Sequence, residues 1–398
     1  MKNKLSSAKP ELLKKMNQEQ ILRQIVKSGE ISRAELSRVT GLALPSVMRL
    51  VEPLIDKGVI KEVREGESTG GRKPNLIALN AHYKWIVGVE ITSIIIITLA
   101  DFSGKVAAAF SFGVNYEDTP EMVLNLIIKE IHNLLSRHNI LPGQVAAIGV
   151  GTPGSDFKHK EEKKGFISKG WEVIDVKSVL EHALEIQTIV ENVCRTRTLS
   201  EIWFGHGRYE SDFLYAFIDW GVGIGIVKQG TLETGYNQVA GEFGHTSIDR
   251  NGRPCYCGKK GCIEMYASVG ALVVEASQFH AENEDENPKH MTESEYFEWL
   301  VLHKERPEIL SEIAELSNAL AFALANVINL MNPKLVVLGG VLPRLIPEIV
   351  DQVKAIIPEY IFHNLALTTP ILQSEVNNEN ECLGSIALVI QSELIECK

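Results

Sequence analysis

The chain has 398 residues, of which 45% are hydrophobic and 23% charged, as is ordinary for a soluble globular protein of roughly two or three domains. Its longest apolar stretch, near residues 93–100, is far shorter than the roughly 20 residues that a membrane-spanning helix needs. The N-terminal lysines are not followed by the apolar core of a signal peptide, so we expect a cytoplasmic protein without membrane insertion.

Charge is distributed unevenly along the chain. Residues 1–80 hold 15 Lys and Arg against 9 Asp and Glu, a net charge of +6, which leaves −17 for the remaining residues. A basic head on an acidic body indicates that only the head meets a polyanion such as nucleic acid.

The basic N-terminal segment has the pattern of three short helices. Apolar residues recur at helical spacing over residues 17–28, and Ser32 with Glu35 matches the capping box that begins a second helix. A third helix is expected over residues 45–58. Three short helices also occur in dimerisation bundles, so this pattern alone leaves both interpretations open.

The third helix and the segment after it carry the candidate DNA contacts. Ser46 and Arg49 face away from the apolar side of the helix, as residues that read the major groove do. Two β-rich stretches then enclose the sequence GESTGGRKP, which is typical of the wing of a winged helix-turn-helix. Its glycines permit a close approach of the backbone, so we expect Arg72 and Lys73 to enter a minor groove. The basic wing favours binding to double-stranded DNA.

The rest of the chain alternates strand and helix patterns. Residues 86–112 predict three antiparallel strands, and residues 119–139 predict a helix whose buried stripe includes Met122. A second unit of strand, glycine turn and strand begins near Phe213. This duplication predicts two α/β lobes that face each other across a cleft, where small ligands bind.

The segment GEFGHTSIDRNGRPCYCGKKGC, residues 241–262, gathers a histidine and three of the six cysteines. One imidazole and three thiolates form a complete tetrahedral set for a metal, with no open position for activating water. A nucleic-acid finger would need a basic surface, whereas Glu242, Asp249 and Glu264 are acidic. We therefore expect a structural metal site, with free buried thiols as the alternative. Its ligands would be His245, Cys255, Cys257 and Cys262.

Five motifs together resemble the ROK family of repressors and sugar kinases, and specifically its repressor branch. They are ISRAELSRVTGL, GESTGGRKP, AGEFGH, GRPCYCGKKGCIEMYAS and INLMNPKLVVLGG, and the resemblance covers essentially the whole chain. It implies a winged helix-turn-helix at 1–80, then a two-lobed actin-like (ribonuclease H-like, duplicated) sugar-kinase-type fold. Its first lobe is expected at 81–200, and its second at 201–398 with the zinc-binding loop and the C-terminal helices.

The resemblance also assigns a metal and a ligand site. It implies structural Zn²⁺ at the histidine and three cysteines named above. It further implies contacts to sugar hydroxyls from Asn192, Glu242, His245 and Glu264. Because the two glutamates flank the metal ligands, one metal would brace both carboxylates; the alternative for each is a solvated loop charge.

The phosphoryl-transfer motifs depart from those of the family's kinases. Where the kinases read D-x-G-G-T, this chain has Glu90–Ile94, and Val193 stands where an E-N-D-A-N motif supplies the catalytic aspartate. Val222 replaces a common threonine in the second phosphate turn. Valine cannot accept a proton, and loss of the base alone costs about 10² to 10⁴ in rate. We expect no enzyme activity; Glu191 is the alternative base, although on an extended strand it would face the opposite way.

The sequence therefore predicts a cytoplasmic, sugar-responsive transcriptional regulator, with repression favoured. We expect a homodimer, or a dimer of dimers, on a pseudo-palindromic DNA operator, with a small sugar or sugar derivative as effector. Two alternatives stay open: an active ATP-dependent sugar kinase that carries a DNA-binding domain, and a zinc-dependent assembly protein without a sugar ligand.

Overall fold

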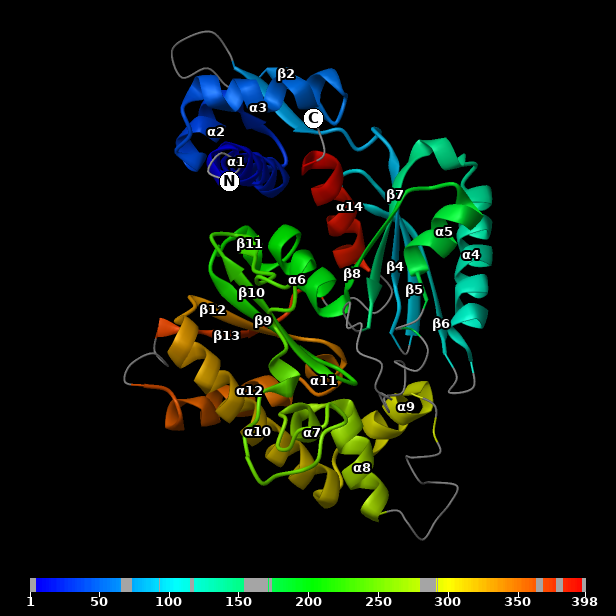
Figure 1. Ribbon diagram of the computed structural model, residues 1–398, viewed down its shortest axis with the longest axis vertical. Helices are drawn as coiled ribbons and strands as arrows, with labels where there is room; N and C mark the ends of the chain where they lie inside the picture. Colours follow the sequence, from blue (N-terminus) through cyan, green and yellow to red (C-terminus); the bar gives the residue numbers. More distant parts are fainter. Residues whose placement is uncertain are drawn as a thin grey trace.

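The protein is built from a small head and a body of two lobes (Figure 1). The computed structural model describes residues 5–65, 74–92, 94–114, 118–153, 171, 174–279, 291, 293–362, 368–376 and 382–395. The predicted wing residues Arg72 and Lys73, and Ser93 of the first phosphate turn, lie outside the described residues.

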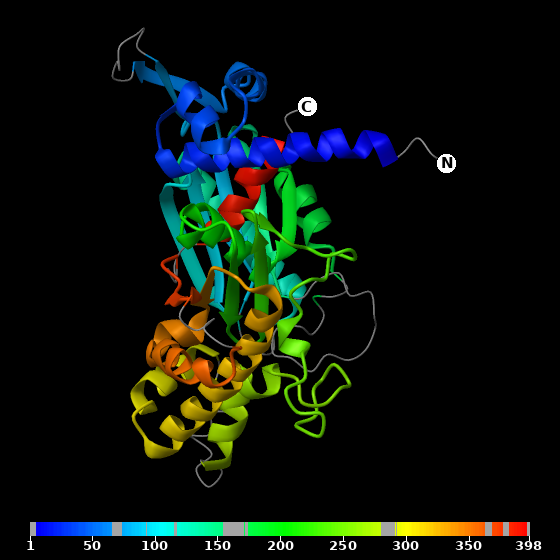
Figure 2. The ribbon, with the colours of Figure 1, turned by 90° about the vertical axis from the view of Figure 1, so that its left-hand side faces the viewer.

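The head contains three helices and a three-stranded antiparallel sheet over residues 5–65 and 74–79. Their bounds are α1 (Leu5–Ser28), β1 (Ile31–Ser32), α2 (Arg33–Thr40), α3 (Leu44–Asp56), β2 (Ile60–Glu65) and β3 (Asn75–Leu79). The side chain of Ser32 accepts a hydrogen bond from the backbone N of Glu35 (3.1 Å), which confirms the predicted cap of α2. α1 begins well before the predicted start and crosses one end of the body (Figure 2).

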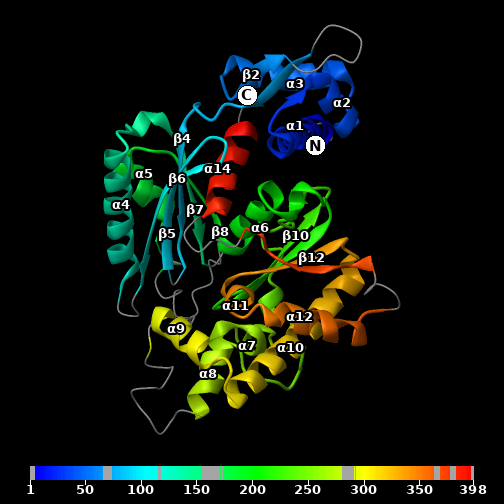
Figure 3. The ribbon, with the colours of Figure 1, turned by 180° about the vertical axis from the view of Figure 1, so that it is seen from behind.

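The first lobe is a five-stranded sheet in the order β6-β5-β4-β7-β8. Its strands are β4 (Trp85–Glu90), β5 (Ile94–Asp101), β6 (Val106–Gly113), β7 (Val145–Thr152) and β8 (Thr188–Asn192). The three predicted strands pair antiparallel, and β7 and β8 continue the sheet in parallel. α4 (Pro120–Arg137) and α5 (Val176–Leu184) cover one face of it (Figure 3).

The predicted stripe of α4 is wrong at one residue. Met122 is 52% exposed, whereas Val123, Ile127 and Ile131 are buried against the sheet. The N-terminal turn is held by Thr119, whose hydroxyl accepts a hydrogen bond from the backbone N of Met122 (3.3 Å). This cap sets the helical phase so that position 123, rather than 122, faces the core.

The second lobe repeats the strand arrangement of the first. Its sheet has the order β11-β10-β9-β12-β13, again with antiparallel pairs at one side and parallel pairs at the other. Its strands are β9 (Phe213–Ile218), β10 (Val222–Lys228), β11 (Thr231–Leu232), β12 (Leu335–Gly339) and β13 (Ile371–Gln373). Its α-helices are α7 (Glu264–Ala267), α8 (Val269–Phe279), α9 (Glu293–His303), α10 (Pro307–Met331), α11 (Val341–Leu345) and α12 (Glu348–Ile356). The matching orders confirm the duplication.

Two helices lie at the centre of the molecule. α6 (Val193–Trp203) follows β8 and contacts β9 and β10 of the second lobe. α14 (Leu383–Ile395) packs on β4 and β7, so the last helix belongs to the first lobe, although it follows the second in sequence (Figure 3). Within the described residues, α10 is the one helix long and apolar enough to cross a membrane, and it packs in the core of the second lobe.

Candidate metal and sugar site

The four predicted metal ligands converge in the structure. The side-chain ligand atoms of His245, Cys255, Cys257 and Cys262, here called the Cys₃His cluster, all lie within 4.8 Å of one another. The chain between them folds back sharply through the left-handed residue Gly261, whose φ is 72°. A Cβ added there would lie 1.7 Å from the carbonyl oxygen of Asp249, so the turn requires glycine.

The spacing within the Cys₃His cluster suits a tetrahedral metal. Cys257 Sγ lies 3.6 Å from Cys262 Sγ, and Cys255 Sγ lies 3.7 Å from His245 Nδ1. With metal–sulfur bonds of about 2.3 Å, as for zinc, the edge of a tetrahedron is about 3.8 Å. The four side chains could therefore hold one metal ion with little movement.

Glu264 ties the Cys₃His cluster to the start of β10. It is buried, with Oε2 accepting a hydrogen bond from the backbone N of Val222 (2.9 Å) and Oε1 accepting one from the hydroxyl of Tyr256. Tyr256 also packs edge-on against the imidazole of His245. Burial and the charge of Glu264 raise the pKa of Tyr256 well above its usual value, so the hydroxyl keeps its proton and donates. A carboxylate accepts about four hydrogen bonds, so Glu264 retains capacity for a ligand.

Asn192 and Glu242 lie on the other side of the same region. Asn192 caps α6, with Oδ1 accepting a hydrogen bond from the backbone N of Cys194 (2.8 Å). Glu242 is exposed. The burial of Cys194 raises the pKa of its thiol to about 12, and the charge of Glu242 adds to this rise. A Cβ on Gly223 would lie 2.8 Å from Cys194 Sγ, which places Cys194 beside Val222 and its partner Glu264. The four predicted sugar contacts thus lie around the facing ends of α6 and β10.

The positions that the family resemblance relates to phosphate transfer include Glu90, Val193 and Glu191. Glu90 is 1% exposed, and its Oε1 accepts a hydrogen bond from Arg197 Nε (3.1 Å) within a buried ion pair. Burial lowers the pKa of Arg197, but the charge and hydrogen bonding of Glu90, together with the charges of Tyr215 and Asp219, outweigh burial and raise it. Val193 is the buried first residue of α6. Glu191, the alternative base, accepts hydrogen bonds from the backbone N of Asn192 (2.7 Å) and from Arg195 Nη1 (3.3 Å).

α6 and β10 connect this region to the head, a relation that the sequence patterns did not reveal. α6 is capped by Asn192 and ends at Trp203, which lines a cavity beneath α1. β10 begins at Val222 and leads to a turn at Gly230 that lines the same cavity. The sequence feature that could have indicated close packing of β10 on another element was the G-x-G spacing of Gly223 and Gly225.

Those glycines hold the two elements together. A Cβ on Gly225 would lie 1.9 Å from Thr198 Oγ1, and one on Gly223 would meet Cys194 on the same face of α6. Because backbone and helix meet without an intervening side chain, α6 and β10 are expected to move as one unit.

The head presents α3 as its candidate DNA-reading element. Arg49 is exposed and Ser46 is half-buried, and the helix buries Val47 with the rest of its apolar face in the head. Arg33, by contrast, forms ion pairs with Glu52 and Glu62, both at 3.0 Å, and so holds α3 and β2 to α2. α3 continues through Pro53 to Asp56.

Two family descriptions match this chain. The ROK family matches residues 87–392, and a winged helix-turn-helix DNA-binding family matches residues 17–61. A solved ROK family transcriptional regulator, a homologue of the Escherichia coli Mlc protein, superposes with a TM-score of 0.72 and 23% identity over 97% of both chains. The fold is thus a winged helix-turn-helix followed by an actin-like, sugar-kinase-type body.

Curated relatives cover different shares of the chain. A xylose repressor from Bacillus spizizenii is 27% identical over 381 residues, which are 95% of this chain and 96% of the repressor. A glucokinase from Halalkalibacterium halodurans is 28% identical over 323 residues, which are 78% of this chain and 96% of the kinase. The repressor therefore matches head and body, whereas most of the kinase's length is matched by a smaller part of the chain.

Proposed function

Because this chain belongs to the ROK family and carries a winged helix-turn-helix, we propose that it is a sugar-responsive DNA-binding repressor. The observation that carries the proposal is the valine at the base position, Val193, beside an assembled set of candidate sugar contacts. A kinase needs a proton acceptor at the base position, and a sensor does not. A relative that matches almost all of this chain is named a xylose repressor, which supports the same assignment.

The proposed resident metal is Zn²⁺. Thiolates and imidazole are the ligands that zinc prefers, and the Cys₃His cluster supplies four with tetrahedral spacing. When bound, the ion would cross-link the loop that carries its four ligands. Because these ligands complete its coordination, no position is left for a reactive water. The chain's own residues then hold the sugar: His245 keeps its second ring nitrogen for a hydroxyl, and Glu264 is fixed by Val222 and Tyr256.

The proposed ligand is a small sugar or sugar derivative. Asn192, Glu242, His245 and Glu264 offer carboxylate, amide and imidazole groups, and such a set binds neighbouring hydroxyl groups in pairs. A ligand that lacks these hydroxyls would leave the buried carboxylate of Glu264 without its further hydrogen bonds and would bind more weakly.

Coupling to DNA would run through α6 and β10. A sugar that draws Asn192 and Glu242 together shifts the near ends of both elements, and their far ends lie beneath α1. For a hundredfold release of DNA, the sugar must bind the released arrangement better by about 2.7 kcal/mol. In the DNA-bound form, a cytoplasmic homodimer would place Ser46 and Arg49 in the major groove and Arg72 and Lys73 in the minor groove of a pseudo-palindromic operator.

The proposal is tested with the full chain, zinc and a panel of hexoses, pentoses and N-acetylhexosamines. An operator is first selected from a random pool of duplex DNA, and its affinity is then measured with each sugar. We expect at least one sugar to weaken DNA binding, and no ATP-dependent turnover of any of them. Turnover above background would establish the kinase instead, and an operator affinity unchanged by the whole panel would remove the sugar response.

A further inference from the structure

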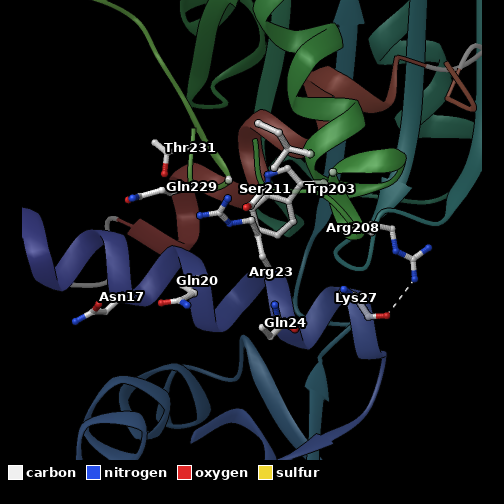
Figure 4. A pocket seen from close by; sticks show the side chains of 13 residues that line it. Asn17, Gln20, Arg23, Gln24, Lys27, Trp203, Arg208, Ser211, Gln229 and Thr231 are labelled. Carbon is white, nitrogen blue, oxygen red and sulfur yellow. Dashed lines mark hydrogen bonds between the residues drawn. The ribbon is translucent and has the colours of Figure 1, made fainter. Parts of the chain in front are cut away.

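A cavity of about 390 Å³, here called the junction cavity, separates the head from the second lobe (Figure 4). Arg23 and Lys27 line it from α1, and Trp203, Arg208 and Gly230 line it from the body. Its volume lies within the range of about 300–1,000 Å³ that is typical of small-molecule sites. None of the predicted sugar contacts lines it.

The charge of the junction cavity is unlike that of the body around it. Among the residues that the structure describes, its lining includes three cations, Arg23, Lys27 and Arg208, and no carboxylate, although the chain has a net charge of −11. Asp212, next in sequence to the lining residue Ser211, is paired with Lys228 at 3.6 Å. An acidic protein that gathers three cations around one cavity creates a local site for an anion.

The cations enter the junction cavity from both sides. Arg23 reaches from α1 to the turn after β10, where a Cβ on Gly230 would lie 1.9 Å from its Nη1 (Figure 4). Arg208 reaches back from the body, and its Nη2 donates a hydrogen bond to the backbone O of Lys27 (3.1 Å). The Nε of Arg208 is buried without a hydrogen-bond partner among the described residues. A buried donor of this kind favours an acceptor nearby, and an anion supplies one.

The remaining lining is suited to hydroxyl groups. Side-chain amides of Asn17, Gln20 and Gln229 and the hydroxyls of Ser211 and Thr231 surround the cations. Amides and hydroxyls both donate and accept hydrogen bonds, so they complement a ligand that does the same. The indole of Trp203 adds an apolar wall.

We propose that the junction cavity is a second effector site, for a small polyhydroxylated anion of the sugar phosphate class. The ligand bridges Arg23 on α1 to Arg208 on the body and binds only while the head is docked, so it favours one placement of the DNA-reading helix. The site is separate from the sugar site, because the eleven residues of α6 span about 16 Å between them.

The test is a calorimetric titration of glucose 6-phosphate, with glucose and inorganic phosphate as comparison ligands, into the full-length zinc-loaded protein. The variants are Arg23→Gln and Arg208→Gln in the junction cavity, Glu242→Gln at the sugar site, and Arg250→Gln as a control on an exposed loop. We expect both cavity variants to weaken glucose 6-phosphate binding by about tenfold or more, the equivalent of one charge-assisted hydrogen bond. Arg250→Gln should leave that binding within about twofold, and Glu242→Gln reports any binding of the ligand at the sugar site.

Three outcomes would overturn the proposal. Binding lost in Glu242→Gln but kept in the arginine variants would place the anion at the sugar site. An equal loss in Arg250→Gln would indicate general ionic attraction, and no binding at about 10 mM ligand would remove the site. If Arg23→Gln melts the head, Arg208→Gln decides alone, because Arg208 belongs to the body. None of these outcomes bears on the DNA response to an unphosphorylated sugar, so the proposed function stands or falls separately.

Discussion

Replacing Arg197 with methionine should destabilise the body strongly. The substitution removes the cation that faces Glu90, whose side chain is 2% exposed and whose Oε1 accepts hydrogen bonds from both Nε and Nη2 of Arg197. The remaining carboxylate would be buried without its partner. Breaking a buried pair in this way costs about 3–5 kcal/mol, against about 0–1 kcal/mol for an exposed pair.

Urea denaturation followed by tryptophan fluorescence measures this loss in the free energy of unfolding. Arg250→Met, on an exposed loop, is the control and should change stability little. The double variant Glu90→Met with Arg197→Met should recover most of the loss, because an apolar pair has no charge to desolvate. A loss below about 1 kcal/mol for Arg197→Met would show that water screens the pair, and would refute the buried-pair reasoning.

Three further substitutions test other parts of the account. Cys257→Ser should lower the melting temperature and weaken sugar binding together, because the proposed metal would brace Glu264; tight sugar binding by metal-free protein would contradict this brace. Gly225→Ala should lower the free energy of unfolding by about 1–3 kcal/mol, because the added methyl overpacks against α6, and should reduce the effect of sugar on DNA affinity. Gly113→Ala is the control, since a Cβ there meets nothing within 4 Å, and should do neither. Equal behaviour of the two variants would exclude the α6–β10 connection. Arg72→Ala should weaken operator binding and relax a preference for A·T pairs beside the half-sites, as measured by fluorescence anisotropy, and an unchanged affinity would exclude the wing.

Local chemistry made much of the fold predictable from the sequence. The cap at Ser32 follows from side-chain hydrogen bonding within three residues, and the first three strands follow from apolar runs and one turn. The Cys₃His cluster was predictable because its last three ligands lie close together in a glycine-containing loop. In each case the interacting groups are near in sequence, so few arrangements satisfy them.

Contacts between distant segments were not predictable in the same way. Glu90 and Arg197 are 107 positions apart, and periodicity shows that a position is buried but not which residue covers it. The return of α14 to the first lobe has the same origin, since an apolar helix fits either core. Gly223 and Gly225 looked like a phosphate turn, and only the structure shows that Cys194 and Thr198 occupy the space beside them.

The sugar response is measured by titrating sugars into the complex of the full-length zinc-loaded protein with its selected operator, followed by anisotropy and by a parallel assay for ATP consumption. The proposed function predicts that one sugar releases the DNA, that Glu242→Gln abolishes the release, and that ATP is not consumed. Phosphorylation of that sugar, or release that persists in Glu242→Gln, would contradict it.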